Sequence, residues 1–355
     1  PPGTGKTYSS ANIIIELMRA GKKVGVTSNS HEAIKTLLKA IEQQAKDQDF
    51  EFSGMRKAKS SDKYDWKFIK DITVSKPLNM DDYSLYAGTS WFFVDPRMNK
   101  TLDYLFIDEA GQVALGTTIA NATSAKNLVL IGDQMQLSQP MRAKHEGYAR
   151  MSSLDFILED KDTISADRGI FLNTTRRLNN KICDFISSSF YDSRLTSDPI
   201  TETRSVNLKL DPIKDEGLFY VPIEHSGCSQ RSDEEADLIE KTYNKIINKE
   251  FKVGKNTGKI SAKDIMVVAP YNAQANNIRE RLKKKFKEEV RVGTIDLFQG
   301  QEAKVVLISM TTSDVESLPR HKDFFFSRNR LNVAISRAEC VAIIIFNENL
   351  LLASA

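Results

Sequence analysis

The first seven residues, PPGTGKT, constrain the fold more than any other feature of this chain. They match the end of the pattern G-x-x-x-x-G-K-[ST], with Gly5, Lys6 and Thr7 in its last three positions. The pattern predicts a loop whose backbone N–H groups hold phosphate, with the lysine at the β/γ-phosphates and the threonine hydroxyl on Mg²⁺. Because the first glycine of the pattern would precede Pro1, we expect the chain to be a fragment that begins inside this loop.

The next residues, YSSANIIIELMRAG, predict a helix. Ile13, Ile14, Leu17 and Met18 form one apolar stripe at helical spacing, and Gly21 suits the C-terminal cap. A helix that begins at the loop would direct its dipole at the phosphates. The alternative, a glycine-rich turn before an ordinary helix, stays open for these residues taken alone.

Composition excludes several classes of protein. A length of 355 residues favours two domains, and the hydrophobic share of 41% and charged share of 27% are typical of a globular protein. The longest apolar runs are strand-sized, so we expect no membrane span and a cytoplasmic protein. Cys183, Cys228 and Cys340 are scattered and the four histidines lack metal spacing, which argues against disulfides and zinc.

Short β-branched runs alternate with helical patterns in two series, which predicts an α/β protein with two mostly parallel sheets flanked by helices. The domains are expected at 1–165 and 166–355, with a small surface insertion containing a helix or two at about 43–82. The predicted strands are VGVTS (24–28), LYAGTS (85–90), YLFIDE (104–109), NLVLIGD (127–133), GIFLN (169–173), LFYVPI (218–223), DIMVVAP (264–270), VRVGTID (290–296), KVVLISM (304–310) and VAIIIF (341–346).

The segment YLFIDEAGQ carries two carboxylates at the end of a predicted strand. Acids at the carboxyl end of such a strand lie beside the phosphate loop, where Asp108 can hold Mg²⁺ and Glu109 can polarise the attacking water. The following strand delivers Gly132, Asp133 and Gln136 to the same edge, where an amide can hydrogen-bond the γ-phosphate or the water. Strands also end at solvated acids and polar turns for no catalytic reason.

PPGTGKT, DEAGQ and GDQMQLSQP resemble motifs of superfamily 1 helicases, in the branch with the nonsense-mediated-decay helicase and the replication nuclease-helicase. LNTTRRLNNKICDFISSSFY, VVAPYNAQ, VGTIDLFQGQE and RLNVAISRA are similar to the later motifs of that branch, in order and spacing. AGTSWFFVDP and ADRGIFLNTT are most similar to fusions of a RecB-like nuclease with such a helicase. The resemblance implies two tandem RecA-like P-loop domains.

The resemblance also implies roles in an ATP site. Arg177 and Arg337 resemble arginine fingers, whose planar charge suits the transferring phosphoryl group, although surface arginines paired with acids are the alternative. The family aromatic that stacks on adenine is Arg176 here, and a guanidinium can also stack on a base. The residues expected to bind the nucleotide are Pro2, Gly3, Thr4, Gly5, Lys6, Thr7, Arg176, Gly300 near the γ-phosphate and Glu302 at the ribose.

Polar residues at strand ends resemble the contacts of the family with single-stranded nucleic acid. They are Ser28, Asn29, Gly88 and Thr89 in the first domain and Tyr271, Asn272, Gln274 and Thr294 in the second. Such groups position a phosphate backbone without reading its sequence, and each of them also suits an ordinary turn or cap. For the neighbouring Trp91, we expect core packing rather than stacking on a base.

These features together predict a monomeric ATP- and Mg²⁺-dependent helicase that closes its two domains around ATP and moves 5′→3′ on single-stranded DNA. The polarity rests on the resemblance alone, and so does a nuclease domain upstream of Pro1. An RNA helicase of the same branch and a translocase that does not separate strands remain alternatives. A ring motor is disfavoured because both arginines lie in this chain, and a scaffold with a dead site because every catalytic residue type is present.

Overall fold

The computed structural model describes residues 1–59, 62–73, 82–138, 147–159, 161–286, 289–314, 316, 318 and 327–352. These residues form two compact units. The N-terminal unit comprises Gly5–Gln134 and Ser138–Ile170, and the C-terminal unit comprises Pro1–Thr4, Met135–Leu137 and Phe171–Ala355. The main division thus falls between Ile170 and Phe171, and the predicted domain bounds of 1–165 and 166–355 stay a prediction.

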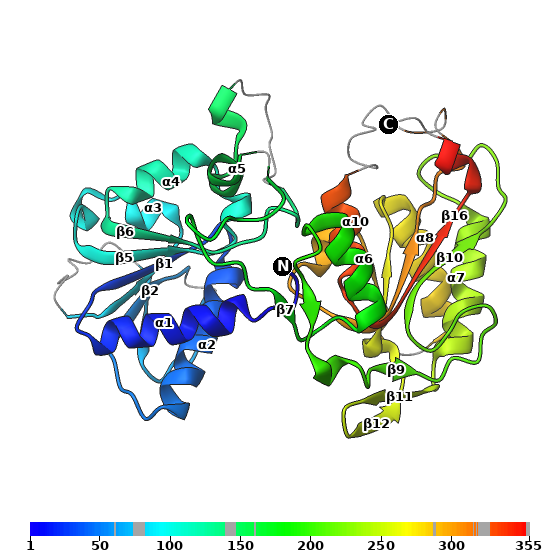
Figure 1. Cartoon of the computed structure of the whole chain (residues 1–355), viewed down its shortest axis with the longest axis horizontal. Coiled ribbons are helices and arrows are strands. Elements are labelled where there is room, and N and C mark those ends of the chain that lie inside the picture. Colours follow the sequence, from blue (N-terminus) through cyan, green and yellow to red (C-terminus); the bar gives the residue numbers. More distant parts are fainter. Residues whose placement is uncertain are drawn as a thin grey trace. The chain divides into compact units, whose positions relative to one another are not determined.

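The N-terminal unit contains a six-stranded parallel sheet in the order β3-β2-β4-β1-β5-β6 (Figure 1). Its helices pack on both faces, and their apolar side chains form two separate clusters, one with α1 and α2 and one with α3. The strands are β1 Val24–Thr27, β2 Gly54–Lys57, β3 Ile69–Ile72, β4 Leu85–Ala87, β5 Leu102–Ile107 and β6 Ala125–Leu130. The helices are α1 Lys6–Arg19, α2 His31–Asp47, α3 Ser90–Phe93, α4 Leu115–Ala122 and α5 Ser153–Leu158.

The C-terminal unit is built on a five-stranded parallel sheet in the order β10-β16-β15-β13-β14. Its strands are β10 Gly217–Pro222, β13 Ile265–Val268, β14 Arg291–Gly293, β15 Ala303–Ser309 and β16 Ala338–Phe346. Its helices are α6 Asn180–Phe190, α7 Asp233–Ile246, α8 Asn272–Lys285 and α10 Arg328–Ile335. Short strands form two small additional sheets: β9 Ser205–Val206, β11 Glu250–Val253 and β12 Asn256–Lys259 in one, β7 Thr174–Thr175 and β8 Thr196–Ser197 in the other.

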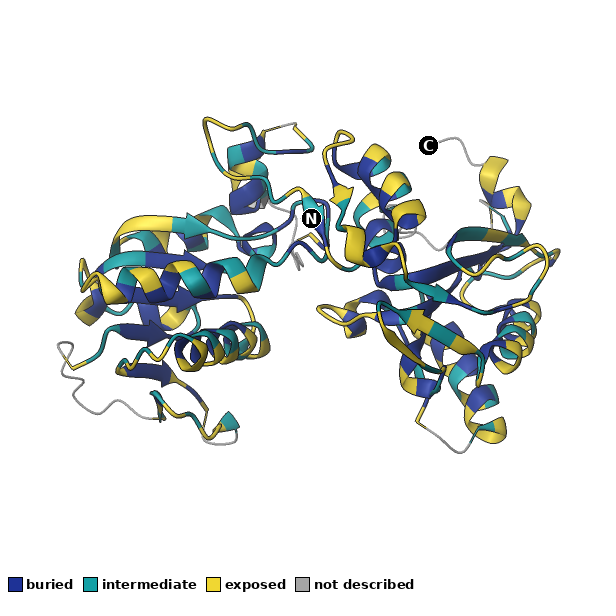
Figure 2. Cartoon of the chain, turned by 60° about the horizontal axis from the view of Figure 1, so that its bottom comes forward, coloured by how far each residue is buried: buried dark blue, intermediate teal, exposed yellow. Residues whose placement is uncertain are grey.

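Burial follows the parallel-sheet pattern in both units. Strands β1, β13 and β16 are almost wholly buried, and the exposed residues gather on the outer faces of the helices (Figure 2). No helix among the described residues is long and apolar enough to cross a membrane. The predicted α/β class with two parallel sheets is therefore what the structure has.

Three details of the sequence prediction were wrong. The segment 43–82 is not a surface insertion, because β2 and β3 within it extend the main sheet. Residues 169–173 form no strand, and Ile170 at the division between the units is 85% exposed. In α1 the buried stripe includes Ala11 and Ile15, whereas Ile13 is 49% exposed.

Candidate functional site

Asp108 and Glu109 follow directly after β5, at the carboxyl end of the N-terminal sheet. The Asp108 backbone N–H donates to the Thr27 carbonyl at 2.9 Å, which fixes this residue beside the end of β1. The Asp108 carboxylate accepts the Glu109 backbone N–H, also at 2.9 Å. Glu109 has φ 53° and ψ 41°, a left-handed conformation that is uncommon for a residue with a side chain. Backbone strain of this kind concentrates at functional sites.

The pKa of Asp108 is raised to about 6. Burial is the main cause, and the negative charge of Glu109 adds to it. The Glu109 backbone N–H and the positive charge of Lys6 act in the opposite direction but do not cancel it. An ionised Asp108 is therefore poorly compensated by this chain, which suits a site that receives a cation.

The loop after β6 packs against the loop that carries the two carboxylates. The Ala110 N–H donates to the Ile131 carbonyl at 2.8 Å, and a Cβ on Gly132 would lie 2.9 Å from the Ala110 nitrogen. Only glycine fits at position 132, so the two loops meet at backbone distance. The structure thus brings Asp133, which is buried, to the same edge as Asp108 and Glu109.

Helix α1 begins at Lys6, with Gly5 as its N-terminal cap at φ 79°. Gly5 offers no side chain to cap the helix, a geometry that suits an anion at the helix N-terminus. Lys6 and Thr7 occupy the first turn, as the predicted phosphate and Mg²⁺ ligands require. After the helix, the Gly21 N–H donates to the Met18 carbonyl at 2.9 Å with φ 73°, which confirms the predicted terminator.

The first four residues, Pro1–Thr4, belong to the C-terminal unit. The Gly3 carbonyl accepts the Arg176 backbone N–H at 2.8 Å. A Cβ on Gly3 would lie 2.4 Å from the Arg177 Cβ, and Gly3 has φ 67°, so this contact requires glycine. Thr4 is buried, and its hydroxyl donates to the Pro1 carbonyl at 3.0 Å. The structure therefore places the front of the predicted loop beside one of the predicted arginine fingers.

Arg177 and Arg337 lie at the edge of the C-terminal sheet where β15 and β16 begin. The Arg177 Nε lies 2.6 Å from a carboxylate oxygen of Glu302, which brings two predicted nucleotide-site residues together. Arg337 is 2% exposed, and its guanidinium donates to the Gln301 carbonyl at 3.0 Å. Both arginines therefore have partners within the chain.

The remaining predicted nucleotide-site residues lie in the same unit. Arg176 is exposed and lies 3.2 Å from Asp198, and Gly300 is exposed at φ 76°. The Gln136 carbonyl accepts the side-chain amide of Asn329 at 2.5 Å. Gln136 thus belongs to the C-terminal unit, whereas Asp108 belongs to the N-terminal unit.

The predicted nucleic-acid contacts of the N-terminal unit share one edge of the sheet. Strands β1 and β4 are parallel neighbours, and the Gly88 N–H donates to the Val26 carbonyl at 3.2 Å. Asn29 is exposed and Thr89 half-buried. Ser28 is only 2% exposed, and its hydroxyl has no hydrogen-bond partner among the described residues. The Asn29 side-chain amide donates to the Gln112 carbonyl, three residues after Glu109.

The predicted contacts of the C-terminal unit are less uniform. Asn272 is exposed, Thr294 and Tyr271 are half-buried, and burial raises the pKa of the Tyr271 hydroxyl. Gln274 is fully buried, and its amide donates to the Ser309 hydroxyl at 3.1 Å and to the Ser232 carbonyl at 3.0 Å. The structure does not bring Gln274 to the surface, so its contact with a strand stays a prediction.

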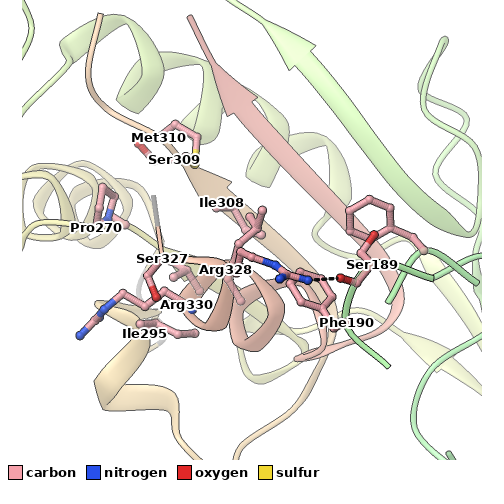
Figure 3. Close-up of a pocket in the computed structure, with 15 residues that line it drawn as sticks. Ser189, Phe190, Pro270, Ile295, Ile308, Ser309, Met310, Ser327, Arg328 and Arg330 are labelled. Carbon is pink, nitrogen blue, oxygen red and sulfur yellow. Dashed lines mark hydrogen bonds between the residues drawn. The ribbon is translucent and has the colours of Figure 1, made fainter. Parts of the chain in front are cut away.

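A pocket of about 350 Å³ lies at the carboxyl ends of β13 and β15 (Figure 3). Its walls are mainly apolar, and Arg328 at its side donates to the Ser189 carbonyl at 2.7 Å. Two residues of its wall are neighbours in sequence of predicted nucleic-acid contacts. Pro270 precedes Tyr271, and Ile295 follows Thr294. Arg177 and Arg337 lie at the opposite edge of this sheet, so the pocket is separate from the predicted nucleotide residues.

Trp91 lies at the surface, which differs from the prediction. We expected core packing, but the side chain is 83% exposed. The signal was present in the two residues that follow, because Phe92 and Phe93 are both buried and turn Trp91 outward in a helix of four residues. Asn179 caps α6, because its side chain accepts the Ile182 N–H at 3.0 Å.

Two protein families match parts of the chain. Residues 153–349, more than half of the chain, match the family described as AAA domain. Residues 1–141 match the helicase domain of the RNA cytidine acetyltransferase NAT10/TcmA.

Curated relatives include the DNA polymerase alpha-associated DNA helicase A of Schizosaccharomyces pombe, 30% identical over 67% of this chain and 36% of that protein. The Neurospora crassa homolog of regulator of nonsense transcripts 1 is 26% identical over 99% of this chain and 35% of its own length. The S. pombe DNA replication ATP-dependent helicase/nuclease dna2 is 25% identical, with 95% and 25% covered. The chain therefore spans about a third of these relatives or less.

A solved structure has a similar fold. The Arterivirus nonstructural protein 10 helicase, in complex with DNA, matches with a TM-score of 0.50 and 14% identity over 97% of this chain and 58% of that chain. The two parallel sheets flanked by helices thus have the fold of two RecA-like helicase domains. The chain belongs to the AAA domain family, among the superfamily 1 helicases.

Proposed function

We propose that this chain is the motor of an ATP-dependent superfamily 1 helicase, which hydrolyses ATP and moves 5′→3′ along single-stranded DNA. The observation that carries the proposal is the carboxylate edge of the N-terminal unit, defined by Asp108 and Glu109. Asp108 has a pKa raised to about 6 within reach of the charge of Lys6, and Glu109 is held in a left-handed conformation. This arrangement fits a site for a metal-bound triphosphate.

The donor atoms at this edge fit Mg²⁺. Mg²⁺ prefers oxygen ligands and is bound in such sites by one or two protein groups together with phosphate oxygens. Asp108 and the hydroxyl of Thr7 would supply those groups, and the raised pKa of Asp108 means that a cation would stabilise its charge. Bound Mg²⁺ would neutralise charge on the phosphates, while Lys6 holds the β/γ-phosphates and Glu109 accepts a proton from the attacking water.

The C-terminal unit supplies positive charge. We assign Arg177 and Arg337 to the charge that develops on the γ-phosphoryl group, Gln136 to the γ-phosphate or attacking water, and Glu302 to the ribose. Arg176 and Gly300 are exposed, as a base-stacking residue and a close-approach glycine require. Glu302 contacts Arg177 in this structure, so nucleotide binding would exchange one partner of Arg177 for another.

Nucleic acid is proposed to contact Ser28, Asn29, Gly88 and Thr89 in the N-terminal unit and Tyr271, Asn272 and Thr294 in the C-terminal unit. Most of these groups are small and polar, which suits backbone contacts that are indifferent to base sequence. The hydrogen bond from Asn29 to the Gln112 carbonyl offers a short path from the strand to the loop of Glu109.

DNA is the proposed substrate because relatives of this chain include a DNA polymerase alpha-associated DNA helicase and DNA replication helicase/nucleases. RNA is the second candidate, since the regulator of nonsense transcripts 1 homologs match nearly all of the chain. A nuclease domain in the same protein, a monomeric state and strand separation beyond translocation are further parts of the proposal.

The test is the ATPase rate of the purified protein with Mg²⁺, measured without nucleic acid and with DNA or RNA oligonucleotides of equal length. We expect strong stimulation by single-stranded DNA, weaker stimulation by RNA, and loss of turnover in Lys6→Ala. Equal rates with and without any oligonucleotide would overturn the motor assignment. Stimulation by RNA alone would overturn the choice of DNA.

A further inference from the structure

Trp91 is 83% exposed, more than any other aromatic side chain in the described ranges. It follows Gly88 and Thr89 after β4 and occupies the second position of α3. A single exposed leucine on a protein surface is ordinary, but a tryptophan exposed to this degree leaves a large apolar ring in water. Tryptophan is enriched at binding interfaces, because its ring offers a large apolar surface together with a polar N–H.

The backbone that carries Trp91 is rigidly held. Phe92 and Phe93 are 3% and 0% exposed, and their rings contact each other with centroids 5.0 Å apart. The Ser90 hydroxyl accepts the side-chain amide of Asn121, a buried residue of α4, at 3.0 Å. The indole is therefore displayed from a fixed turn rather than from a loose loop, which lowers the entropy lost when a ligand stacks on it.

The position of Trp91 coincides with the proposed track for nucleic acid. Strand β4 lies between β1 and β2 in a parallel sheet, so the residues after these three strands share one edge. Those residues include Asn29 after β1 and Thr89 after β4, and Lys57 ends β2. A single-stranded nucleic acid that contacts these polar groups would pass next to the indole, because Trp91 is only two residues after Thr89.

Charges around this turn favour a phosphate backbone. Lys57 is exposed, and its Nζ lies 5.8 Å from the centroid of the Phe92 ring. Lys59 is also exposed. The nearby acid, Asp95, lies 2.6 Å from the Arg97 guanidinium, whose hydrogen bonds hold the pKa of that carboxyl well below its usual range. Lys57 thus places an exposed positive charge near Phe92, the residue that follows Trp91.

We propose that Trp91 is a stacking platform for an unpaired base of the single strand that crosses the N-terminal unit. The inference rests on the proposed motor function and adds to it a contact with a base. Aromatic rings stack on every base, so the platform holds the strand without reading its sequence. Lys57 and Lys59 would contact phosphates on either side of the stacked base.

The experiment uses the two tryptophans of the chain. Trp66 is half-buried, and its indole N–H donates to Asp71 at 3.1 Å. Trp66→Phe leaves Trp91 as the only tryptophan of the chain, so selective excitation of tryptophan reports on Trp91 alone. In that variant, titration with oligothymidylate should quench the emission to a plateau. Oligonucleotides of other base composition should quench it with similar half-saturation, and higher salt should shift all the curves to higher concentration.

Affinity is measured separately with Trp66 intact, by anisotropy of a dye-labelled oligonucleotide. Trp91→Ala should weaken binding by roughly 5- to 100-fold, and Trp91→Phe by less, because the smaller ring still stacks. Tyr148→Ala is the matched control, since Tyr148 is 70% exposed in the same unit, and its affinity should equal that of the wild type.

The outcomes separate this inference from the proposed function. If Trp91→Ala binds and is stimulated by single strands like the wild type, the platform is refuted and the motor stands; a protein partner would then be the better explanation of the exposed ring. Stacking is also refuted if the oligonucleotide quenches the emission of Trp66→Phe while Trp91→Ala binds it with wild-type affinity. A wild-type protein that neither binds nor responds to single strands refutes both.

Discussion

The two units differ in how their charged side chains are compensated. The carboxylate edge lies in the N-terminal unit, and the arginine edge, defined by Arg177 and Arg337, lies in the C-terminal unit. Asp108 is a half-buried acid with its pKa raised to about 6, next to a second acid in a strained conformation. Arg177 forms an ion pair with Glu302 at 2.6 Å, and Arg337 donates to the Gln301 carbonyl at 3.0 Å. One edge is undercompensated, and the other has partners from its own chain.

The difference indicates how each edge would respond to a nucleotide. A cation bound at the carboxylate edge removes an existing electrostatic penalty, so the resting state favours binding. At the arginine edge a phosphate must compete with partners that are already in place. The arginines would then stabilise the transition state more than the ground state, if only the charge that develops on the γ-phosphoryl group attracts them more strongly than their present partners do.

Arg337→Ala is expected to have the largest effect on turnover. Loss of the guanidinium should lower kcat by roughly 10³-fold or more with only a modest change in ATP affinity, because a finger acts mainly on transition-state charge. The measurement is single-strand-stimulated ATPase together with nucleotide binding. Because Arg337 is buried, Arg337→Lys and melting temperatures control for folding. Equal losses of ADP and ATP affinity with unchanged kcat would make Arg337 a structural residue.

Glu109→Gln tests the other edge. We expect ATP binding to persist while turnover falls by roughly 10²-fold or more, as for loss of a general base. Glutamine keeps the size of the side chain and leaves the left-handed backbone at this position unchanged. Initial hydrolysis rates at saturating ATP check the prediction. A wild-type rate would show that the catalytic carboxylate lies elsewhere.

Asp108→Asn should stabilise the unfilled site. A folded pKa near 6 lies above the ordinary value of about 3.9, so the stability that the neutral acid contributes is present below pH 4 and is lost as pH rises through 6. The variant lacks this loss and should be more stable at pH 7 to 8, by up to about 3 kcal/mol. Urea unfolding in EDTA between pH 4 and 8 measures the gap. A gap that does not grow with pH contradicts the raised pKa.

The smallest expected effect concerns coupling to the strand. Paired Asn29→Ala and Thr294→Ala substitutions should raise the half-saturating oligonucleotide concentration about fivefold or more, through the loss of two hydrogen bonds. Basal hydrolysis should survive, because neither residue is assigned to the phosphates. ATPase titrations with mixed sequences at two salt concentrations measure this, with the exposed pair Asn256 and Thr257 changed to alanine as the control. An unchanged half-saturation would refute the proposed contacts.

The sequence predicted those features that depend on residues close together in the chain. Parallel buried strands read as apolar runs, and Gly5 and Gly21 mark the start and end of α1 because only glycine adopts those backbone angles without cost. The chain position of Asp108 and Glu109 followed from a strand that ends in two acids. Their meeting with the Gly132 loop depends on a tertiary contact, which no local pattern contains.

Two of the errors arose because the type of a residue does not show which partners it has. The segment that contains β2 was expected to be a surface insertion because it is polar, basic and poorly periodic. Its Arg56 is nevertheless 1% exposed and forms a bidentate ion pair with Asp71 at 2.7 and 2.9 Å. The sequence alone does not distinguish a charged side chain that is buried with its partner from one that is exposed to water. Trp91 shows the opposite case. Aromatic residues usually pack in a core, but here Phe92 and Phe93 fill that position and Trp91 is exposed.

The strand order of the N-terminal unit has a consequence for folding. Every strand pairing in its main sheet is parallel, so each pair is joined by a long crossover, whereas β11 and β12 of the C-terminal unit pair across a tight hairpin from Val253 to Asn256. Closing long loops before contacts form slows folding. During synthesis the N-terminal unit emerges first, yet its central strand β1 must wait for both neighbours, β4 and β5, to leave the ribosome. Strand β10 of the C-terminal unit waits longer still, because its neighbour in the described sheet is β16. The nascent chain of each unit therefore exposes unpaired strand edges, and a chaperone that bound at that stage would protect them from aggregation.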